Sequence, residues 1–527
     1  MLIYFVLVPV LIAVFLYLLP SFKVAKAIAV LIQGALLLAA LRLFILAQEA
    51  PVIIYAGNYT SFLGIILQAD QLASIFVILT VFVFLCVTVY SFNDKTNRLY
   101  WFLLFTLEGA LIGLFLTRDL FNIFVLAEVT SVAATVFLMY DRNNRSVYDG
   151  MIYLMVNTVV MQFYLLGLAY IYMLTGFLDM GYATAALATL DRSQIALPYA
   201  LVMVAIAAKC GVLPLFTFLP KVHSIPRAPV SVAAILSGLQ VKSGLYLFLR
   251  FRDVFGGINM REFFLVIGIV TAVFGIVLAL GQSDIRRMLA YSTIAHVGFI
   301  MVGLNLNTAY AHVGSVYYMV GHTVAKVALF LSAGVVIQSY KTGEVSEIRG
   351  VFRRMPIVGT AIALSILGIT GAPFFSGNVS KYFMMDRSGI LMYIVMTLIS
   401  LGTIAVFVKF GAILFGKSAK EIKQGDPVKQ VSVLLLGITC LAGGIFGVEL
   451  INLLFGVSVS ISTAGFIGRL PILLGSWAAG YLFVRYYARD NAGLRVIGRL
   501  DIGFRGICVS IGTLFALILT MVGFFAL

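Results

Sequence analysis

Long apolar runs, each about the length of a bilayer crossing, alternate with short polar segments along almost the whole chain. A spanning helix needs about 20 mostly apolar residues, and by that rule the sequence predicts about sixteen spans. Their approximate ranges are 2–19, 24–47, 69–92, 99–117, 120–140, 151–175, 194–222, 228–250, 263–282, 288–304, 312–339, 356–385, 389–415, 431–455, 468–487 and 506–526. The first range lacks a basic leader and a small-residue cleavage pattern, so we interpret it as a spanning helix. The fold class is therefore an all-α polytopic membrane protein.

Two of the predicted spans contain residues that interrupt helices. The seventh span holds Pro214 and Pro220, and the twelfth holds Pro373 among three glycines. Proline removes a backbone donor and clashes with the preceding turn. Broken helices at matching positions in two halves are typical of transporters built from inverted repeats. The pattern therefore predicts two five-helix repeats, 99–250 and 251–416, between N-terminal helices in 1–98 and C-terminal helices in 417–527.

The composition and the loop charges agree with a membrane location. Of 527 residues, 62% are hydrophobic and 11% are charged, whereas about 25% are charged in soluble domains. The net charge of +15 comes with basic loops after the odd-numbered spans, which is typical of cytoplasmic loops rather than of a nucleic-acid surface. This bias predicts a cell-membrane protein with both termini outside, although Arg250, Arg252 and Arg261 follow an even-numbered span. The four cysteines stand far apart, which disfavours metal, iron–sulfur and disulfide sites.

Charged residues inside the apolar runs are the main candidates for function. Glu128 lies nine residues after Asp119, about 13 Å into a core that is roughly 30 Å thick. Lys209 lies at a similar depth, one turn before Pro214. Burial disfavours a charged amine and a nearby carboxylate favours it. A Glu–Lys pair whose separation changes is therefore a candidate proton switch, with a structural ion pair as the alternative.

Four further residues extend this set along the chain. Lys242 lies eight residues before Arg250, deep in its span unless its long side chain reaches an interface. His322 and Lys326 are four residues apart and so share a helix face, and an imidazole suits a proton relay. Lys381 follows the second predicted break.

Several other titratable residues are weaker candidates. Glu108, in the fourth span, is expected either to load protons or to pair with a lysine. His223 and Arg227, just after the second proline of the seventh span, could connect the buried set to one surface. Asp70 and Asp119, near span starts, are expected to cap helices or to form interfacial pairs.

The sequence contains no convincing nucleotide or cofactor motif. The stretch from Gly411 to Ser418 fits the phosphate-loop pattern, but it ends an apolar span and no strand precedes it. We therefore expect no cofactor and no metal in this chain, and no redox or nucleotide site of its own.

Five stretches give the chain a family resemblance. DLFNIFVLAEV (119–129), the stretch 209–250 that begins KCGVLPLF, DIRRMLAYSTIAHVG (284–298), HTVAKVALFLSAG (322–334) and GITGAPFFSGNVSK (368–381) resemble the antiporter-like subunits. This family comprises the D and A subunits of Mrp sodium/proton antiporters, the N, M and L subunits of respiratory complex I and matching subunits of membrane-bound hydrogenases. The chain most resembles the D-type subunits of the Mrp antiporters.

The resemblance implies a fourteen-helix core with two inverted five-helix repeats, broken helices 7 and 12, and a central hydrophilic axis. The residues that match this axis are Glu128, Lys209, Lys242, His322, Lys326 and Lys381. The chain departs from the family at Arg118, where a glycine is usual, and at Glu108, which is not in the usual pattern. It also has two extra C-terminal helices, which read as ordinary spans rather than as a long lateral helix.

We therefore expect a proton-translocating subunit of a multisubunit membrane complex, which moves protons alone or in exchange for sodium along a buried Glu/Lys/His axis. Its partners would be other membrane subunits, protons, sodium ions and lipid, and no nucleic acid. One alternative is the pump arm of a redox-driven complex with a peripheral redox module, either an NADH/quinone or ferredoxin oxidoreductase or a membrane-bound hydrogenase. Another is a non-transporting scaffold subunit.

Overall fold

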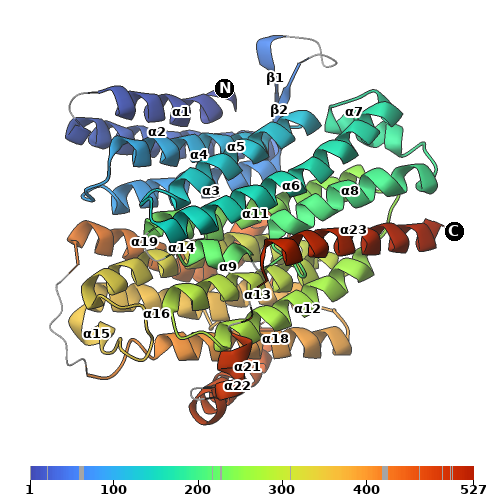
Figure 1. Ribbon diagram of the computed structural model, residues 1–527. Helices are drawn as coiled ribbons and strands as arrows, with labels where there is room; N and C mark the ends of the chain where they lie inside the picture. The colour runs from blue at the N-terminus through green and yellow to red at the C-terminus, as the bar shows by residue number, and fades with distance from the viewer. Residues whose placement is uncertain are drawn as a thin grey trace.

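The protein is almost entirely helical, with one short hairpin. The computed structural model describes residues 2–19, 22–58, 64–216, 218–225, 228–308, 310–417, 425–461, 463–488, 491–498, 500 and 502–526. The N-terminal part contains α1 (Leu2–Leu18), α2 (Phe22–Glu49), β1 (Val52–Tyr55), the 3-10 turn η1 (Ala56–Asn58), β2 (Ile66–Ala69) and α3 (Gln71–Tyr90). The two strands pair antiparallel and project from one edge of the helices (Figure 1).

The first predicted repeat contains nine elements. They are α4 (Arg98–Leu116), α5 (Leu120–Leu138), α6 (Asn144–Thr175), α7 (Met180–Leu187), α8 (Arg192–Cys210), α9 (Phe218–His223), α10 (Val230–Ile235), the π-helical turn η2 (Leu236–Gln240) and α11 (Val241–Val254). The second contains α12 (Arg261–Leu280), α13 (Ile285–Asn305), α14 (Ala311–Tyr340), α15 (Val351–Arg354), α16 (Pro356–Thr370), α17 (Ser376–Met385) and α18 (Ile390–Gly411). The C-terminal part contains α19 (Pro427–Ile445), α20 (Gly447–Phe455), α21 (Thr463–Phe483), the π turn η3 (Val484–Ala488), α22 (Ala492–Ile497) and α23 (Phe504–Ala526).

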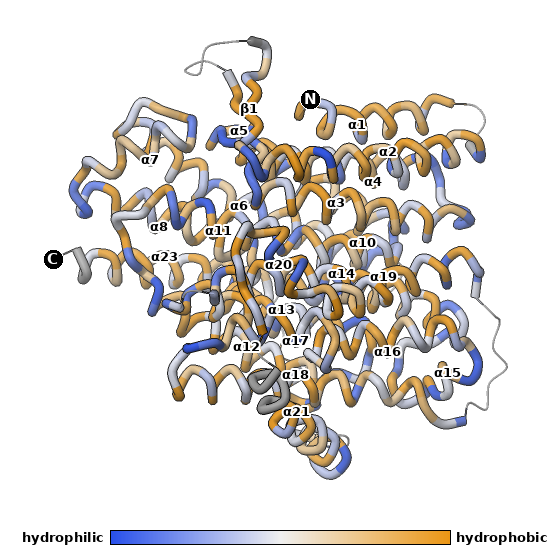
Figure 2. The backbone as a smooth tube through the Cα atoms, turned by 180° about the vertical axis from the view of Figure 1, so that it is seen from behind, coloured by the Kyte–Doolittle hydropathy of each residue, from blue (hydrophilic) through white to orange (hydrophobic). Residues whose placement is uncertain are grey.

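Each of the predicted spans coincides with one helix or with consecutive helical segments separated by a break or a π turn. Among the described residues, 13 helices are long and apolar enough to cross a membrane, and α1 and α16 are shorter apolar helices. Most of the long helices run side by side, and their bodies are mostly hydrophobic, with hydrophilic segments gathered toward the two ends (Figures 1 and 2). This arrangement matches a polytopic membrane protein.

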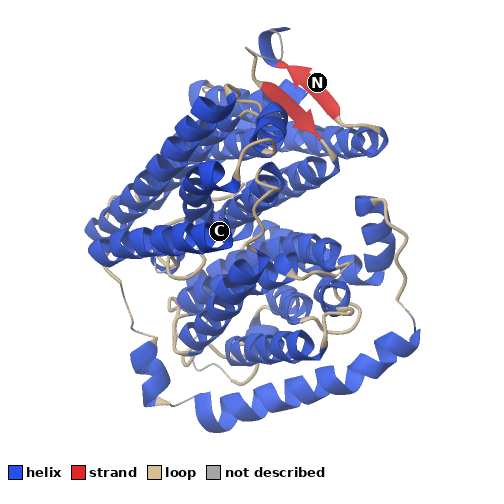
Figure 3. Cartoon of the chain, turned by 90° about the vertical axis from the view of Figure 1, so that its right-hand side faces the viewer, coloured by secondary structure: helices blue, strands red, loops and turns tan. Residues whose placement is uncertain are grey.

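One C-terminal helix lies differently from its expected direction. Residues 468–487 read as an ordinary span, but α21 is seen nearly end-on below α18 in Figure 1 and runs along the lower edge in Figure 3. It therefore crosses the long helices, and Gly480 allows it to approach the backbone of Ala405 in α18. Hydropathy measures transfer into lipid and carries no direction, so an apolar helix lying across others reads as a span.

Both predicted helix breaks are present. The seventh span divides at Gly211 into α8 and α9, and the twelfth divides at Gly371 into α16 and α17. Both glycines are left-handed, with φ of 70° and 83°. Glycine adopts this conformation without the steric cost that a side chain brings. The long span 312–339 is one continuous helix, α14.

Two backbone bridges, each made of two hydrogen bonds, relate the halves of the chain. At the start of α5, Leu120 N–H bonds the Leu178 carbonyl and Met180 N–H bonds that of Arg118. At the start of α13, Ile285 N–H bonds the Gly343 carbonyl and Val345 N–H bonds that of Ser283. The first bridge lies next to α7 and the second precedes α15, at opposite ends of the long helices (Figure 1). These bridges support the proposal that 99–250 and 251–416 are inverted repeats.

An ion pair fixes the end of α11 beside the start of α3. Asp70 caps α3 by accepting from the Ala73 N–H at 2.8 Å, and its two oxygens also accept from Arg250, both at 2.6 Å. Burial would raise the pKa of the Asp70 carboxyl, but the hydrogen bonds and charge of Arg250 lower it below its ordinary value. The pair is partly buried, so it contributes more than an exposed pair does. Asp70 is therefore both a cap and an interfacial partner.

The substitution Asp70→Asn isolates this ion pair, because asparagine still caps a helix. We expect it to cost about 2 kcal/mol at neutral pH, as for a hydrogen bond to a charged group. Since the folded pKa is lowered, this stability is present above the unfolded value of about 3.9 and is lost as the pH falls through the folded pKa. Thermal unfolding in detergent at several pH values measures it. Asp149→Asn, in the longer 3.9 Å pair with the exposed Arg145, is the control; an equal effect there would contradict the argument.

Candidate functional site

Lys209 is held against α5 at the end of the broken helix α8. Its side chain is buried, and its Nζ donates to the Ser131 hydroxyl at 2.7 Å and to the Ala127 carbonyl at 3.4 Å. The Ser131 hydroxyl itself donates to the same Ala127 carbonyl. Gly244 of α11 touches the backbone of Lys209, which fixes the position of the helix end. The ammonium therefore has polar partners in an otherwise apolar layer.

Glu128 lies on the same helix as these partners, one turn before Ser131. It is half-buried, and its Oε1 is buried without a hydrogen-bond partner. Within the described residues no ion pair of 4.0 Å or less joins Glu128 to Lys209, because the lysine points to Ser131 and Ala127. The structure thus contains the expected pair in a separated arrangement. Contact at 4 Å would contribute about 4 kcal/mol of attraction at an effective dielectric constant of 20.

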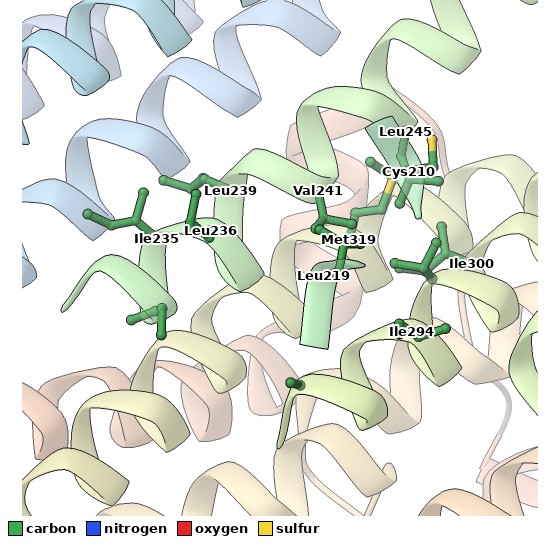
Figure 4. Close-up of a cluster of buried hydrophobic side chains, with 14 of the residues drawn as sticks. Cys210, Leu219, Ile235, Leu236, Leu239, Val241, Leu245, Ile294, Ile300 and Met319 are labelled. Carbon is green, nitrogen blue, oxygen red and sulfur yellow. The ribbon is translucent and has the colours of Figure 1, made fainter. Parts of the chain in front are cut away.

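The π turn between α10 and α11 positions Lys242. Val241 N–H bonds the Leu236 carbonyl, which leaves the Ser237 carbonyl without its α-helical partner. Lys242 is fully buried and its Nζ donates to that carbonyl at 2.6 Å. Apolar side chains surround this turn, including Leu236 and Leu239 on it and Met319 on α14 (Figure 4). The irregular helix therefore supplies the acceptor that a buried ammonium requires.

Two side-chain hydrogen bonds connect the π turn to its neighbours. Gln240 Nε2 donates to the Thr130 hydroxyl of α5 at 3.2 Å. On the other side, the Ser237 and Thr293 hydroxyls are 2.7 Å apart, which joins the turn to α13. The turn therefore lies between the Lys209 group and the second repeat.

Beyond the π turn lie two histidines. Together with Lys209 and Lys242 they form a line of buried polar side chains. His322 on α14 and His296 on α13 are buried, with ring centroids 4.8 Å apart. The Tyr318 hydroxyl lies 2.8 Å from Nδ1 of His296, whereas both ring nitrogens of His322 and Nε2 of His296 have no partner. Imidazole rings this close, with ring nitrogens free of other partners, can exchange a proton over a short path.

Lys326 sits one turn from His322, as their spacing predicts. Its Nζ donates to the Leu289 carbonyl at 3.0 Å and to the Ser292 hydroxyl, and Ser292 bonds the same carbonyl. The Lys209 group repeats this arrangement of a lysine, a serine and one shared carbonyl. Both serines lie on helices, α5 and α13, that open with equivalent backbone bridges.

Lys381 occupies the second break. Its Nζ donates at 2.9 Å to the carbonyl of Thr370, the last residue of α16. The final carbonyls of a helix lack intrahelical donors and carry partial negative charge, so they favour a cation. The ammonium also lies 5.5 Å from the centroid of the Phe299 ring on α13.

The structure places two of the weaker candidates, Glu108 and His223, in buried positions. Glu108 is fully buried and accepts from Gln33 Nε2 at 2.6 Å, so its partner is an amide and not the neighbouring lysine considered above. His223 ends α9, fully buried, with both ring nitrogens unpartnered and its ring 6.1 Å from that of Phe330. Arg227 lies outside the described residues.

His296 and Gln240 are the polar members of this line that sequence reasoning missed. His296 is one of only four histidines in the chain and lies near the middle of the apolar run 288–304. An imidazole near the middle of an apolar run could have been identified as a candidate from the sequence. Gln240 offered no such signal, because the π turn that directs it toward Thr130 cannot be read from local spacing. Among the described residues, no group of three or more His, Cys, Asp or Glu could hold a metal ion.

Comparisons with known proteins agree with the expected resemblance. Residues 117–407 match the family described as "NADH:quinone oxidoreductase/Mrp antiporter, TM". The D subunit of the Na(+)/H(+) antiporter of Alkalihalophilus pseudofirmus is 30% identical over 348 residues, 64% of this chain and 69% of the relative. The N subunit of the NADH-quinone oxidoreductase of Desulforudis audaxviator is 29% identical over 466 residues, 82% of this chain and 91% of the relative.

A solved structure supports the fold. A chain of the Mrp complex from Dietzia sp. superposes with a TM-score of 0.80, covering 90% of this chain and 99% of that chain at 22% identity. At that identity the likeness concerns the fold alone.

Gly371→Ala tests how the second break positions Lys381. Alanine at this left-handed residue is strained by about 1 kcal/mol, and its Cβ would also lie 3.2 Å from the Lys381 Cδ. The matched control is Gly176→Ala, where φ is 75° and no atom lies within 4 Å of the added Cβ. We expect both variants to lower the unfolding temperature and Gly371→Ala to lower it more. Equal losses would show that the lysine stem adjusts freely.

Proposed function

This chain belongs to the NADH:quinone oxidoreductase/Mrp antiporter transmembrane family, and from that premise we propose that it is a proton-translocating subunit of a multisubunit membrane complex. The observation that carries the proposal is the line of buried ionisable side chains, three of which are held at the two helix breaks and the π turn. Burying a charge at bilayer depth costs several kcal/mol. Ionisable side chains kept at that depth therefore indicate a function. The groups on this line are Lys209, Lys242, His322 with His296, and Lys381, and Lys326 lies beside the histidines.

Protons move along this line between groups that each have few fixed partners. A proton from the cytoplasm reaches Lys242 or His322, passes through His296, and leaves by way of Lys381. Lys326 is held by a carbonyl and a hydroxyl beside the histidines and sets the local charge. His223, with two unpartnered ring nitrogens, connects this line to the cytoplasmic face.

Glu128 and Lys209 form the control element. In the separated arrangement Lys209 is bound by Ser131, and in contact with Glu128 its charged form is stabilised. Alternation between the two states moves charge next to Gln240 and Lys242. A movement of one charge against 100 mV costs about 2.3 kcal/mol, so a counter-ion gradient or a redox reaction must drive the cycle.

A neighbouring membrane subunit is the proposed partner at Glu128. On the outer face of α5, Val125, Val129 and Val132 are exposed beside the half-buried glutamate. A transmembrane neighbour with a basic side chain would bury this apolar face and attract the carboxylate away from Lys209. Glu108, bonded to Gln33 and away from the line, is not assigned a step in transport.

The loop charges support an orientation in the cell membrane. The loops between α3 and α4 and around α15 are basic and lie on one side of the protein, and we assign that side to the cytoplasm with both termini outside. Sodium exchange and bound lipid belong to the same proposal, whereas a peripheral redox module belongs to the second candidate.

A second candidate is the pump arm of a redox-driven complex. The relative that matches 82% of this chain is named as a subunit of an NADH-quinone oxidoreductase. Co-purification in mild detergent separates the two candidates: iron–sulfur subunits in the complex indicate the redox-driven form, and their consistent absence from an intact active complex indicates the antiporter form.

Lys209→Ala should abolish ion transport without preventing assembly, because it removes the amine that alternates between Ser131 and Glu128. Transport is measured as proton movement in membrane vesicles carrying the complete complex, and assembly as co-purification of its subunits. The control is Lys409→Ala, since Lys409 is half-buried and bonds the Leu280 carbonyl away from the line. Full transport by an assembled Lys209→Ala complex would remove the switch.

His296→Gln should slow transport strongly, by about 100-fold if the imidazole relays protons, because glutamine can hydrogen-bond but does not titrate. His312→Gln is the matched control, since His312 lies at the start of α14 near Arg252. Comparable rates for the two variants would exclude His296 from the pathway.

A further inference from the structure

A cavity with charged residues in its lining opens at the end of the helices that carries most of the basic loops. Its volume is about 340 Å³, and its lining includes Asp94, Arg286 and Lys429 with Tyr100, Ser231 and Gly334. Lys429 forms an ion pair with Asp94 at its rim. Val230 of α10 packs against Gly334 of α14, so the two helices meet at its wall.

A chain of three hydroxyl groups reaches this cavity, because two of its members, Tyr100 and Ser231, line it. The Tyr100 hydroxyl is 2.7 Å from the Ser91 hydroxyl and 2.7 Å from the Ser231 hydroxyl. Tyr100 is buried, and its ring packs edge-on against those of Phe137 and Trp101, which fixes where its hydroxyl points. Each hydroxyl can both donate and accept, so the chain can conduct a proton in either direction.

Residue positions along α14 and α10 place the buried histidine and lysines deeper than this cavity. Four residues deeper than Gly334 on α14, Phe330 contacts the ring of His223. Lys326 lies four residues deeper than Phe330. Each of these four-residue intervals spans about 6 Å along the helix. On the neighbouring helix, Ser231 precedes Ser237, the partner of Lys242, by six residues, or about 9 Å. His223 thus lies in depth between the cavity and both lysines, with two unpartnered nitrogens.

We propose that Ser91, Tyr100 and Ser231 form the proton-uptake gate of this chain, which delivers protons from the cavity to His223 and then to Lys242. The inference rests on the proposed function and names its uptake side. In each passage a hydroxyl accepts one proton and releases its own, so its net charge is restored and no co-reactant is consumed. Rotation of the hydroxyls then resets the chain, and water spans the interval between Ser231 and the imidazole.

Tyr100→Phe removes the central hydroxyl and keeps the ring packing. In vesicles carrying the complete complex, we expect proton transport to fall about tenfold or more, equivalent to about 1.4 kcal/mol. The loss should shrink when the proton concentration on the cavity side is raised, because uptake has become limiting, and should not respond to the opposite side. The control is Tyr164→Phe, another buried tyrosine, whose hydroxyl bonds the Leu120 carbonyl.

Ser231 provides a second test that does not depend on the tyrosine. Ser231→Ala should reproduce the loss of transport that shrinks when the proton concentration on the cavity side is raised. Ser231→Thr, which keeps a hydroxyl, should retain most of the transport rate. If Tyr100→Phe and Ser231→Ala complexes both transport at the unmodified rate while Lys209→Ala is inactive, the gate is overturned and the proposed function stands. If the Lys209→Ala complex also transports normally, the proposed function itself fails.

Discussion

The structure depends on one constraint, which is that an ammonium or imidazole at bilayer depth must find hydrogen-bond partners that no lipid can supply. Regular helices offer few, because their carbonyls already accept from the next turn. In this chain two of the acceptors come from irregular backbone. The π turn releases the Ser237 carbonyl for Lys242, and the end of α16 presents the Thr370 carbonyl to Lys381. Lys209 and Lys326 each use a serine hydroxyl together with the carbonyl that the serine itself bonds.

The repeats explain why these acceptors recur in pairs. Equivalent backbone bridges open α5 and α13, and equivalent glycine breaks end α8 and α16. The proposed inverted repeats thus use one folding solution twice and place polar backbone near the middle of the helices from both sides. The π turn with Gln240 lies between the two halves and connects Thr130 of α5 with the helices of the second repeat.

Proton transfer needs groups that are held in place but still have an atom without a hydrogen-bond partner. His322 and His223 have unpartnered ring nitrogens in buried positions, whereas the lysines are anchored to carbonyls and hydroxyls. A buried polar group without a partner is costly, and that cost favours binding a proton or a water molecule there. Glu108 contrasts with this, because its amide partner Gln33 lies away from the lysines and histidines.

The sequence by itself determined the helices and the breaks. Apolar run length reflects bilayer thickness, and prolines and glycines act on their own turn, so both properties are local and readable. Lys209, Lys242, His322, Lys326 and Lys381 were likewise visible as charges or imidazoles in apolar surroundings. Only the tertiary structure decided that Lys209 is separated from Glu128, that His296 faces His322, and that α21 lies across the other helices. Those outcomes depend on how helices distant in sequence pack against one another, and hydropathy contains no term for the direction of a helix or for the distance between residues far apart in sequence.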